Sequence, residues 1–141
     1  LYLPSGQQIA LQRACREADR LRKMITASKN RLLATDQFAW LGLANLIPPF
    51  GARAHWVRSY WYNPWRVLQA GEDTLARAWQ EASLTQPADI SWLKPFLARA
   101  QLIVDLYDQP DCLDYEQLQA SLHREQERYQ AWRVERLQLQ S

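Results

Sequence analysis

The stretch SGQQIALQRACREADRLRKMITASKNRL, from Ser5 to Leu32, decides the fold class of this chain. Apolar side chains recur in it mostly at steps of three and four residues, with Ser28 as the weak member of the series. The stripe consists of Leu11, Ala14, Ala18, Leu21, Ile25 and Leu32. This spacing predicts a long amphipathic helix with one buried face. The opposite face carries the basic residues and is expected to be solvated.

Beyond this helix, prolines divide the chain into further helix-sized pieces. Pro48-Pro49 ends the first segment, which is either one helix or two with a break near Thr35-Asp36. Asn63-Pro64 supplies an N-cap and a first helical residue, and Asp114 caps a long last helix with charges of both signs on its flanks. The expected helical segments are residues 1–47, 52–83, 89–107 and 114–139.

No strand pattern competes with these helices. The sequence has no sustained alternation of apolar and polar residues, no Asn-Gly or Asp-Gly hairpin turn, and only 4 glycines. A length of 141 residues is typical of one domain. We therefore predict an all-α fold, a single-domain helical bundle over residues 1–141. It should have four to six helices, with a long first helix and a long charged C-terminal helix.

The net charge of +2 hides a difference between the two halves of the chain. Residues 1–68 contain ten Lys or Arg and three Asp or Glu, whereas residues 69–141 contain seven and twelve. Two explanations stay open at this point. The halves attract each other within one fold, or the basic half faces an anionic partner.

Residues 51–68 read GARAHWVRSYWYNPWRVL and combine five large aromatic side chains with basic ones and no carboxylate. Tryptophan, tyrosine and arginine are enriched at interface hot spots. On one helix, at about 100° per residue, the five aromatic side chains would cover nearly the whole circumference and could not share one buried stripe. The segment is therefore expected to be a contact surface. Its predicted partner-binding residues are Arg53, His55, Trp56, Arg58, Tyr60, Trp61 and Arg66.

No signature of catalysis or of cofactor binding is recognised. The phosphate loop, the dinucleotide fingerprint and the nucleophile elbow are absent, and no Cys or His cluster has metal-ligand spacing. Asp105, Asp108, Asp111 and Asp114 recur every third residue, but the glycine of a calcium loop is missing, so turn and cap roles explain them better. We predict a protein that is not an enzyme and has no cofactor and no metal.

Cys15 and Cys112 lie 97 positions apart and are expected to be free thiols on or near the core, as in a reducing compartment. No signal peptide is recognised at the start. The longest uncharged run, Gln37 to Ala52, is interrupted by prolines and is shorter than the roughly 20 apolar residues of a spanning helix. These features predict a cytoplasmic protein.

Three functions from different classes fit these features. We favour a non-catalytic interaction or assembly subunit that contacts a protein partner, or another copy of itself, through the Trp/Tyr/Arg-rich face. The alternative is a nucleic-acid-binding helical module, a small subunit of a ribonucleoprotein or of a replication or defence complex. Its phosphate-contacting residues would be Arg13, Arg16, Arg20, Lys23, Lys29 and Arg31. A second alternative is peripheral attachment to a membrane surface, because the apolar run from Phe38 to Phe50 precedes the aromatic cluster. No small-molecule substrate is indicated.

Overall fold

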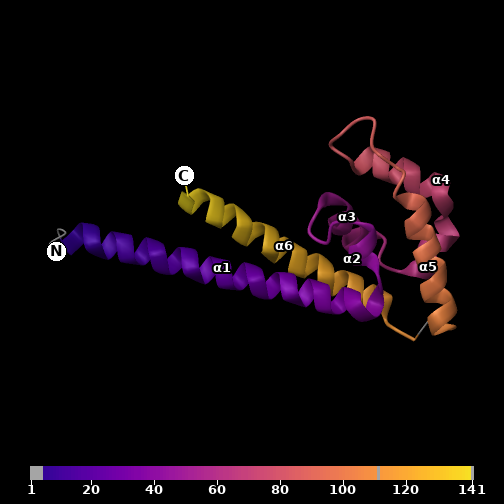
Figure 1. Cartoon of the computed structure of the whole chain (residues 1–141), viewed down its shortest axis with the longest axis horizontal. Helices are drawn as coiled ribbons and strands as arrows, with labels where there is room; N and C mark the ends of the chain where they lie inside the picture. The colour runs from indigo at the N-terminus through magenta and orange to yellow at the C-terminus, as the bar shows by residue number, and fades with distance from the viewer. Residues whose placement is uncertain (1–4, 111, 141) are drawn as a thin grey trace.

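The computed structural model describes residues 5–110 and 112–140, and this part of the chain forms six α-helices and no strand. The all-α prediction and the predicted number of helices are therefore confirmed. The helices are α1 (Ser5–Ala39), α2 (Leu43–Leu46), α3 (Ala52–Tyr60), α4 (Pro64–Ala82), α5 (Leu93–Tyr107) and α6 (Tyr115–Gln140). Figure 1 shows α1 and α6 as a long antiparallel pair, with α4 and α5 at the end away from the termini.

The antiparallel pair is held in register by contacts between side chains distant in sequence. The Tyr115 hydroxyl donates to the carbonyl oxygen of Ala39 at 2.7 Å, and Arg31 pairs with Glu125. By this register α6 ends before the first turns of α1, which extend past it (Figure 1). The predicted apolar stripe of α1 is accordingly buried only from Leu21 onward. Leu11 is exposed because no helix lies opposite it.

The first segment is a single helix through Thr35-Asp36 and breaks later, between α1 and α2. Gly42 has a φ of 84°, a left-handed conformation that favours glycine. A Cβ atom there would also meet the guanidinium group of Arg99, at 3.0 Å. The chain therefore turns after Ala39, forms the short α2, and reaches Pro48-Pro49 before α3 begins.

Helix α4 begins as predicted and contains an unpredicted kink. The Asn63 side chain accepts a hydrogen bond from the backbone N–H of Trp65 at 3.0 Å, and Pro64 occupies the first turn. The kink lies at Gly71, which has a non-helical backbone conformation inside α4. It has a φ of 80°, and nothing lies within 4 Å of the position of a Cβ atom, so its role is to bend the backbone.

The core joins the long pair to the α4–α5 end of the molecule through aromatic rings. Trp40 is fully buried and stacks on Phe96 of α5 with ring centroids 4.8 Å apart. Its indole Nε1 donates to the carbonyl oxygen of Tyr62 at 2.6 Å. Buried tryptophans need such partners for their polar atom. This contact therefore ties the turn after α1 to the segment between α3 and α4.

Beside this core lies a buried polar network that links α1, α3 and α6. The Arg58 guanidinium, 1% exposed, pairs with the Asp36 carboxylate, with Nη2 and Oδ2 2.5 Å apart. Tyr62 donates its hydroxyl hydrogen to the same carboxylate at 2.8 Å, and Gln126 accepts a hydrogen bond from Arg58 at 3.3 Å. Burial, aided by the Asp36 charge, raises the pKa of Tyr62 well above its usual value, so the hydroxyl stays a donor.

We expect Arg58→Ala to destabilise the protein by about 3–5 kcal/mol, because it leaves the Asp36 carboxylate buried without its cation. The free energy of unfolding, measured by chemical denaturation, checks this. The matched control is Arg66→Ala, which removes an exposed ion pair with Glu116 and should cost less than about 1 kcal/mol. Equal losses in the two variants would contradict the structural role assigned to Arg58.

Candidate functional site

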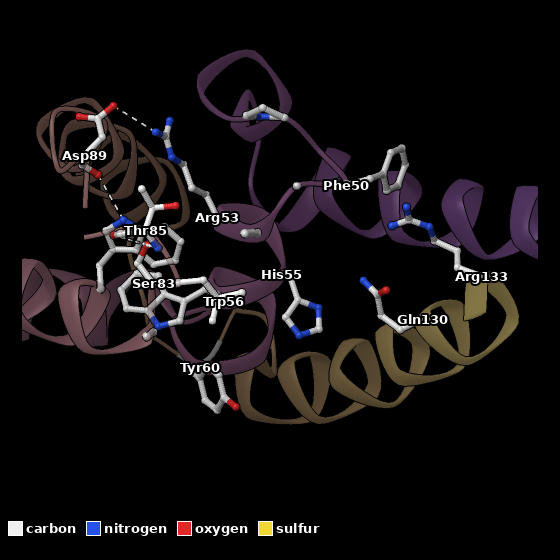
Figure 2. A pocket seen from close by; sticks show the side chains of 16 residues that line it. Phe50, Arg53, His55, Trp56, Tyr60, Ser83, Thr85, Asp89, Gln130 and Arg133 are labelled. Atoms are coloured by element: carbon white, nitrogen blue, oxygen red, sulfur yellow. Dashed lines mark hydrogen bonds and ion pairs between the residues drawn. The ribbon is translucent and has the colours of Figure 1, made fainter. Parts of the chain in front are cut away.

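A groove of about 1080 Å³ lies between α3, the connection from α4 to α5, and α6. Helix α3 contributes Arg53, His55, Trp56 and Tyr60 to its lining. The connection contributes Ser83, Leu84, Thr85 and Asp89, and α6 contributes Gln130 and Arg133. Figure 2 shows these side chains, with Phe50 and Arg133 at the end of the groove away from Asp89. Helix α3, which carries part of the predicted contact surface of residues 51–68, thus meets two other segments of the chain at this groove.

The floor of the groove is formed by Trp56 and Trp79, which belong to a cluster of three tryptophan rings completed by Trp92. The Trp56 ring lies 5.2 Å from that of Trp79 and 5.9 Å from that of Trp92, and both neighbours pack against each other edge-on. Trp79 donates its indole N–H to the carbonyl oxygen of Asp89 at 3.2 Å. Tilted and edge-on ring pairs of this kind are the favoured arrangements. The floor is consequently apolar, and Trp79 ties it to the connection that forms the opposite wall.

One wall of the groove is fixed by an ion pair. Arg53 Nη2 lies 3.1 Å from Asp89 Oδ2, and the guanidinium carbon lies 5.8 Å from the centre of the Trp92 ring. Asp89 also accepts hydrogen bonds from the hydroxyl and the backbone N–H of Ser91. These bonds, with Arg53, lower the pKa of Asp89. Asp89 therefore stays a carboxylate and compensates the Arg53 charge.

His55 is a half-buried side chain on the same helix, and it is not a source of positive charge. Burial lowers its pKa from 6.5, and the nearby His123 and Arg58 lower it further. The imidazole is therefore neutral at pH 7. The positive charge around the groove comes instead from lysine and arginine side chains.

Those cations gather where the groove meets a second hollow of about 400 Å³. The two share Phe50 and Arg133, and the second hollow adds Lys29 of α1 and Arg136 of α6. The Lys29 ammonium lies 5.2 Å from the centre of the Phe50 ring, and the Arg133 guanidinium carbon lies 5.6 Å from that of Tyr129. Within the described ranges no carboxylate pairs with Lys29, Arg133 or Arg136. We call these three residues the cationic edge of the groove.

The structure brings together four of the seven predicted partner-binding residues, namely Arg53, His55, Trp56 and Tyr60. Tyr60 is 60% exposed, whereas Trp56 is buried and offers only the floor of the groove. The expectation that Arg58 lies on this surface was wrong, because its guanidinium is buried against Asp36.

The remaining two predicted residues are also separated from the groove. Trp61 does not line it and packs against the core, with its ring 6.1 Å from that of Trp56. Arg66 is exposed elsewhere, in a shallow hollow where it pairs with Glu116 at 2.7 Å. The reason is that α3 ends at Tyr60. Residues 61–63 are not helical, so the five aromatic side chains never share one helix.

The predicted phosphate-contacting residues divide into two groups. Arg20 pairs with Glu17, Lys23 with Asp19, and Arg31 with Glu125. Arg13, Arg16 and Lys29 make no ion pair in the part of the chain that the structure describes. Only Lys29 of these six lies beside the groove. Three of the six charges are therefore already compensated by carboxylates within the fold.

Sequence reasoning missed Phe50, Leu84, Arg133 and Arg136 as members of this site. Leu84 could have been identified from the sequence, because an apolar residue in a polar, proline-containing connection is expected to be exposed. It is 103% exposed and lines the groove. Arg133 and Arg136 carried no such signal, because the last helix alternates both charge signs throughout.

The cysteines and histidines do not form a catalytic arrangement among the described residues. Cys15 and Cys112 are free thiols, as predicted, but both are exposed, which corrects the expectation that they lie on or near the core. Neither histidine ring is hydrogen-bonded to a serine, threonine or cysteine of residues 5–110 and 112–140. His123 pairs with Glu127 at 3.0 Å.

Residues 5–110 and 112–140 contain no group of three His, Cys, Asp or Glu side chains able to hold a metal ion. Asp114 caps α6 by accepting a hydrogen bond from the backbone N–H of Gln117 at 3.0 Å, as predicted. Asp111, the predicted turn residue, lies outside the described residues. None of the helices in the described ranges has the length and apolar character to cross a membrane.

Comparison with protein-family models, with curated proteins and with solved structures finds no match for this chain. The function is therefore inferred from its own residues and their geometry.

The lowered pKa of His55 predicts that acid destabilises the protein. The unfolded chain, in which the histidine pKa is the higher one, takes up the proton first. The free energy of unfolding should therefore fall as the pH drops through about 6.5. His55→Gln should flatten this dependence between pH 7 and pH 5, as followed by urea denaturation at each pH. His123→Gln should flatten it less, since it removes only a neighbour, and unchanged slopes in both variants would overturn the assignment.

Proposed function

We propose that this protein is a non-catalytic helical interaction module that binds a segment of a partner protein in the groove beside α3. The observation that carries the proposal is the combination of an apolar tryptophan floor with a cationic edge that no carboxylate of the described residues compensates. Interfaces commonly join an apolar centre to a charged rim, with Trp, Tyr and Arg enriched. The groove offers each of these along one continuous surface.

The chemistry of the lining defines the partner segment. Apolar side chains fit against Leu84, Phe50 and the floor, while carboxylates pair with Lys29, Arg133 and Arg136. The Arg53 charge is already paired with Asp89 and adds little attraction for an anion. The expected ligand is therefore an extended or helical segment with alternating apolar and acidic residues.

The exposure of the rings favours a protein segment over a nucleic acid. Binding of single strands relies on stacking of successive bases against exposed aromatic faces. Trp56 and Trp79 are buried, and their faces are covered by neighbouring rings. Tyr60 offers one exposed ring, and three of the six predicted phosphate-contacting residues, Arg20, Lys23 and Arg31, are already paired with carboxylates.

Selection from a library of short random peptides tests the proposal directly. We expect enriched peptides to carry apolar and acidic side chains and to bind at the groove, so that Arg133→Glu and Lys29→Glu each weaken binding by about tenfold or more. The matched control is Arg66→Glu, which reverses an exposed arginine outside the groove and should leave affinity unchanged. Isothermal titration calorimetry measures the affinities, and circular dichroism checks that each variant is folded.

The same variants distinguish the other partner classes. Tight binding of single-stranded poly(U) RNA, with a steep loss of affinity as salt is raised, would favour the nucleic-acid module instead. Binding to vesicles that contain phosphatidylserine but not to neutral vesicles would favour membrane attachment. Peptides that bind equally well to Arg133→Glu and to Arg66→Glu would place the interaction elsewhere and overturn the groove assignment.

A further inference from the structure

Helix α5 has an apolar face that packs on nothing in the described chain. Its buried face, with Phe96, Ala100 and Ile103, meets the core. On the opposite side Leu102 and Leu106, 57% and 64% exposed, lie one turn apart and continue from the exposed Ala98. None of these residues lines the groove described above. The face is therefore a separate surface of the molecule.

Two more apolar side chains lie near this face. Phe38, at the end of α1, and Leu41, in the turn that follows it, are 48% and 54% exposed. The hydroxyl of Tyr107, next to Leu106, donates to the carbonyl oxygen of Phe38. On the preceding turns of α5, the Arg99 guanidinium lies against Gly42. These contacts hold the backbone at Phe38 and Gly42 against α5, the helix that carries the exposed Leu102 and Leu106. Exposed apolar side chains grouped on one part of a protein surface mark interaction sites.

The charges along α5 are arranged with opposite signs at its two ends. Lys94 lies in the first turn, while Asp105 and Asp108 lie at the last turn and just after it. At the helical period Lys94, Ala98, Gln101 and Asp105 form a line beside the two leucines. Gln101 donates to the Asp105 carboxylate at 2.9 Å, but no ion pair neutralises Lys94 or Asp105 within residues 5–110 and 112–140.

This arrangement is complementary to itself when a second helix runs in the opposite direction. A two-fold axis at the level of residues 98–102 places Lys94 of one copy beside Asp105 of the other, twice per pair. The same rotation keeps the leucines of both copies on one side of the contact, where they meet. It also aligns the two helix dipoles antiparallel. An interface formed by the same patch on both copies is what two-fold symmetry requires.

We propose that the exposed face of α5, with Ala98, Leu102 and Leu106 and the adjoining Phe38 and Leu41, is the interface of an antiparallel homodimer. A second copy satisfies both features of the face at once, because it covers the leucines and supplies a carboxylate for Lys94. The groove beside α3 remains free in each copy.

A charge-swap experiment tests this dimer. In a dimer of Lys94→Glu two acidic side chains would face each other, and in a dimer of Asp105→Lys two lysines would do so. The dimerisation affinity of each variant alone should therefore be lower than that of the wild type by about tenfold or more. An equimolar mixture restores two opposite-charge contacts and should dimerise close to the wild-type level. Sedimentation velocity over a range of protein concentrations measures each association.

Two further variants test whether the apolar contact itself holds the dimer together. Leu102→Glu should abolish dimerisation while circular dichroism shows an intact fold, because the side chain is already exposed. Arg66→Glu, on another surface, should dimerise normally. A wild-type protein that stays monomeric at every concentration, a dimer that survives Leu102→Glu, or a mixture no stronger than its two components would each overturn the proposal.

Discussion

The buried ion pair between Arg58 and Asp36 is the constraint on which the arrangement of the helices depends. A guanidinium that is 1% exposed is tolerated only with a charged partner and further hydrogen bonds. Asp36 supplies the partner from α1, and Gln126 adds an acceptor from α6. Misplacing α1 or α3 would leave a buried charge unpaired, and misplacing α6 would remove a hydrogen bond to Arg58, so the network specifies how α3 sits against the long pair.

The position of α3 in turn creates the groove. Arg58 lies on the side of this helix that enters the network, so Arg53 and Trp56, which lie on its other side, face the connection between α4 and α5. Gln126 also donates to the carbonyl oxygen of His55 at 3.1 Å and to the Ser59 hydroxyl at 2.9 Å, which holds α6 close enough to form a wall. The buried polar contacts thus set the distance between α3 and α6, which lie on either side of the groove.

Helical periodicity and capping residues were enough to predict the fold class and most helix starts, because these signals depend on neighbours in sequence. The Asn63-Pro64 start of α4 and the Asp114 cap of α6 are examples. The burial of Arg58 depends instead on a carboxylate 22 residues away, and local sequence does not reveal that pairing. The same limit applies to the groove, whose walls come from three segments. The early end of α3 at Tyr60 redirected the aromatic side chains that one continuous helix would have left exposed.

The distribution of charge shows that a basic surface cannot be predicted from the net charge of one half of the sequence. Ion pairs between the two halves neutralise several positive charges of the first half within the fold. These pairs are Arg31–Glu125, Arg53–Asp89 and Arg66–Glu116, and they agree with the explanation that the halves attract each other. The uncompensated cations at the groove come from both halves, since Arg133 and Arg136 belong to the acidic one. What matters for an anionic partner is therefore which cations the fold leaves without a carboxylate, and that is decided by helix register, not by net charge along the chain.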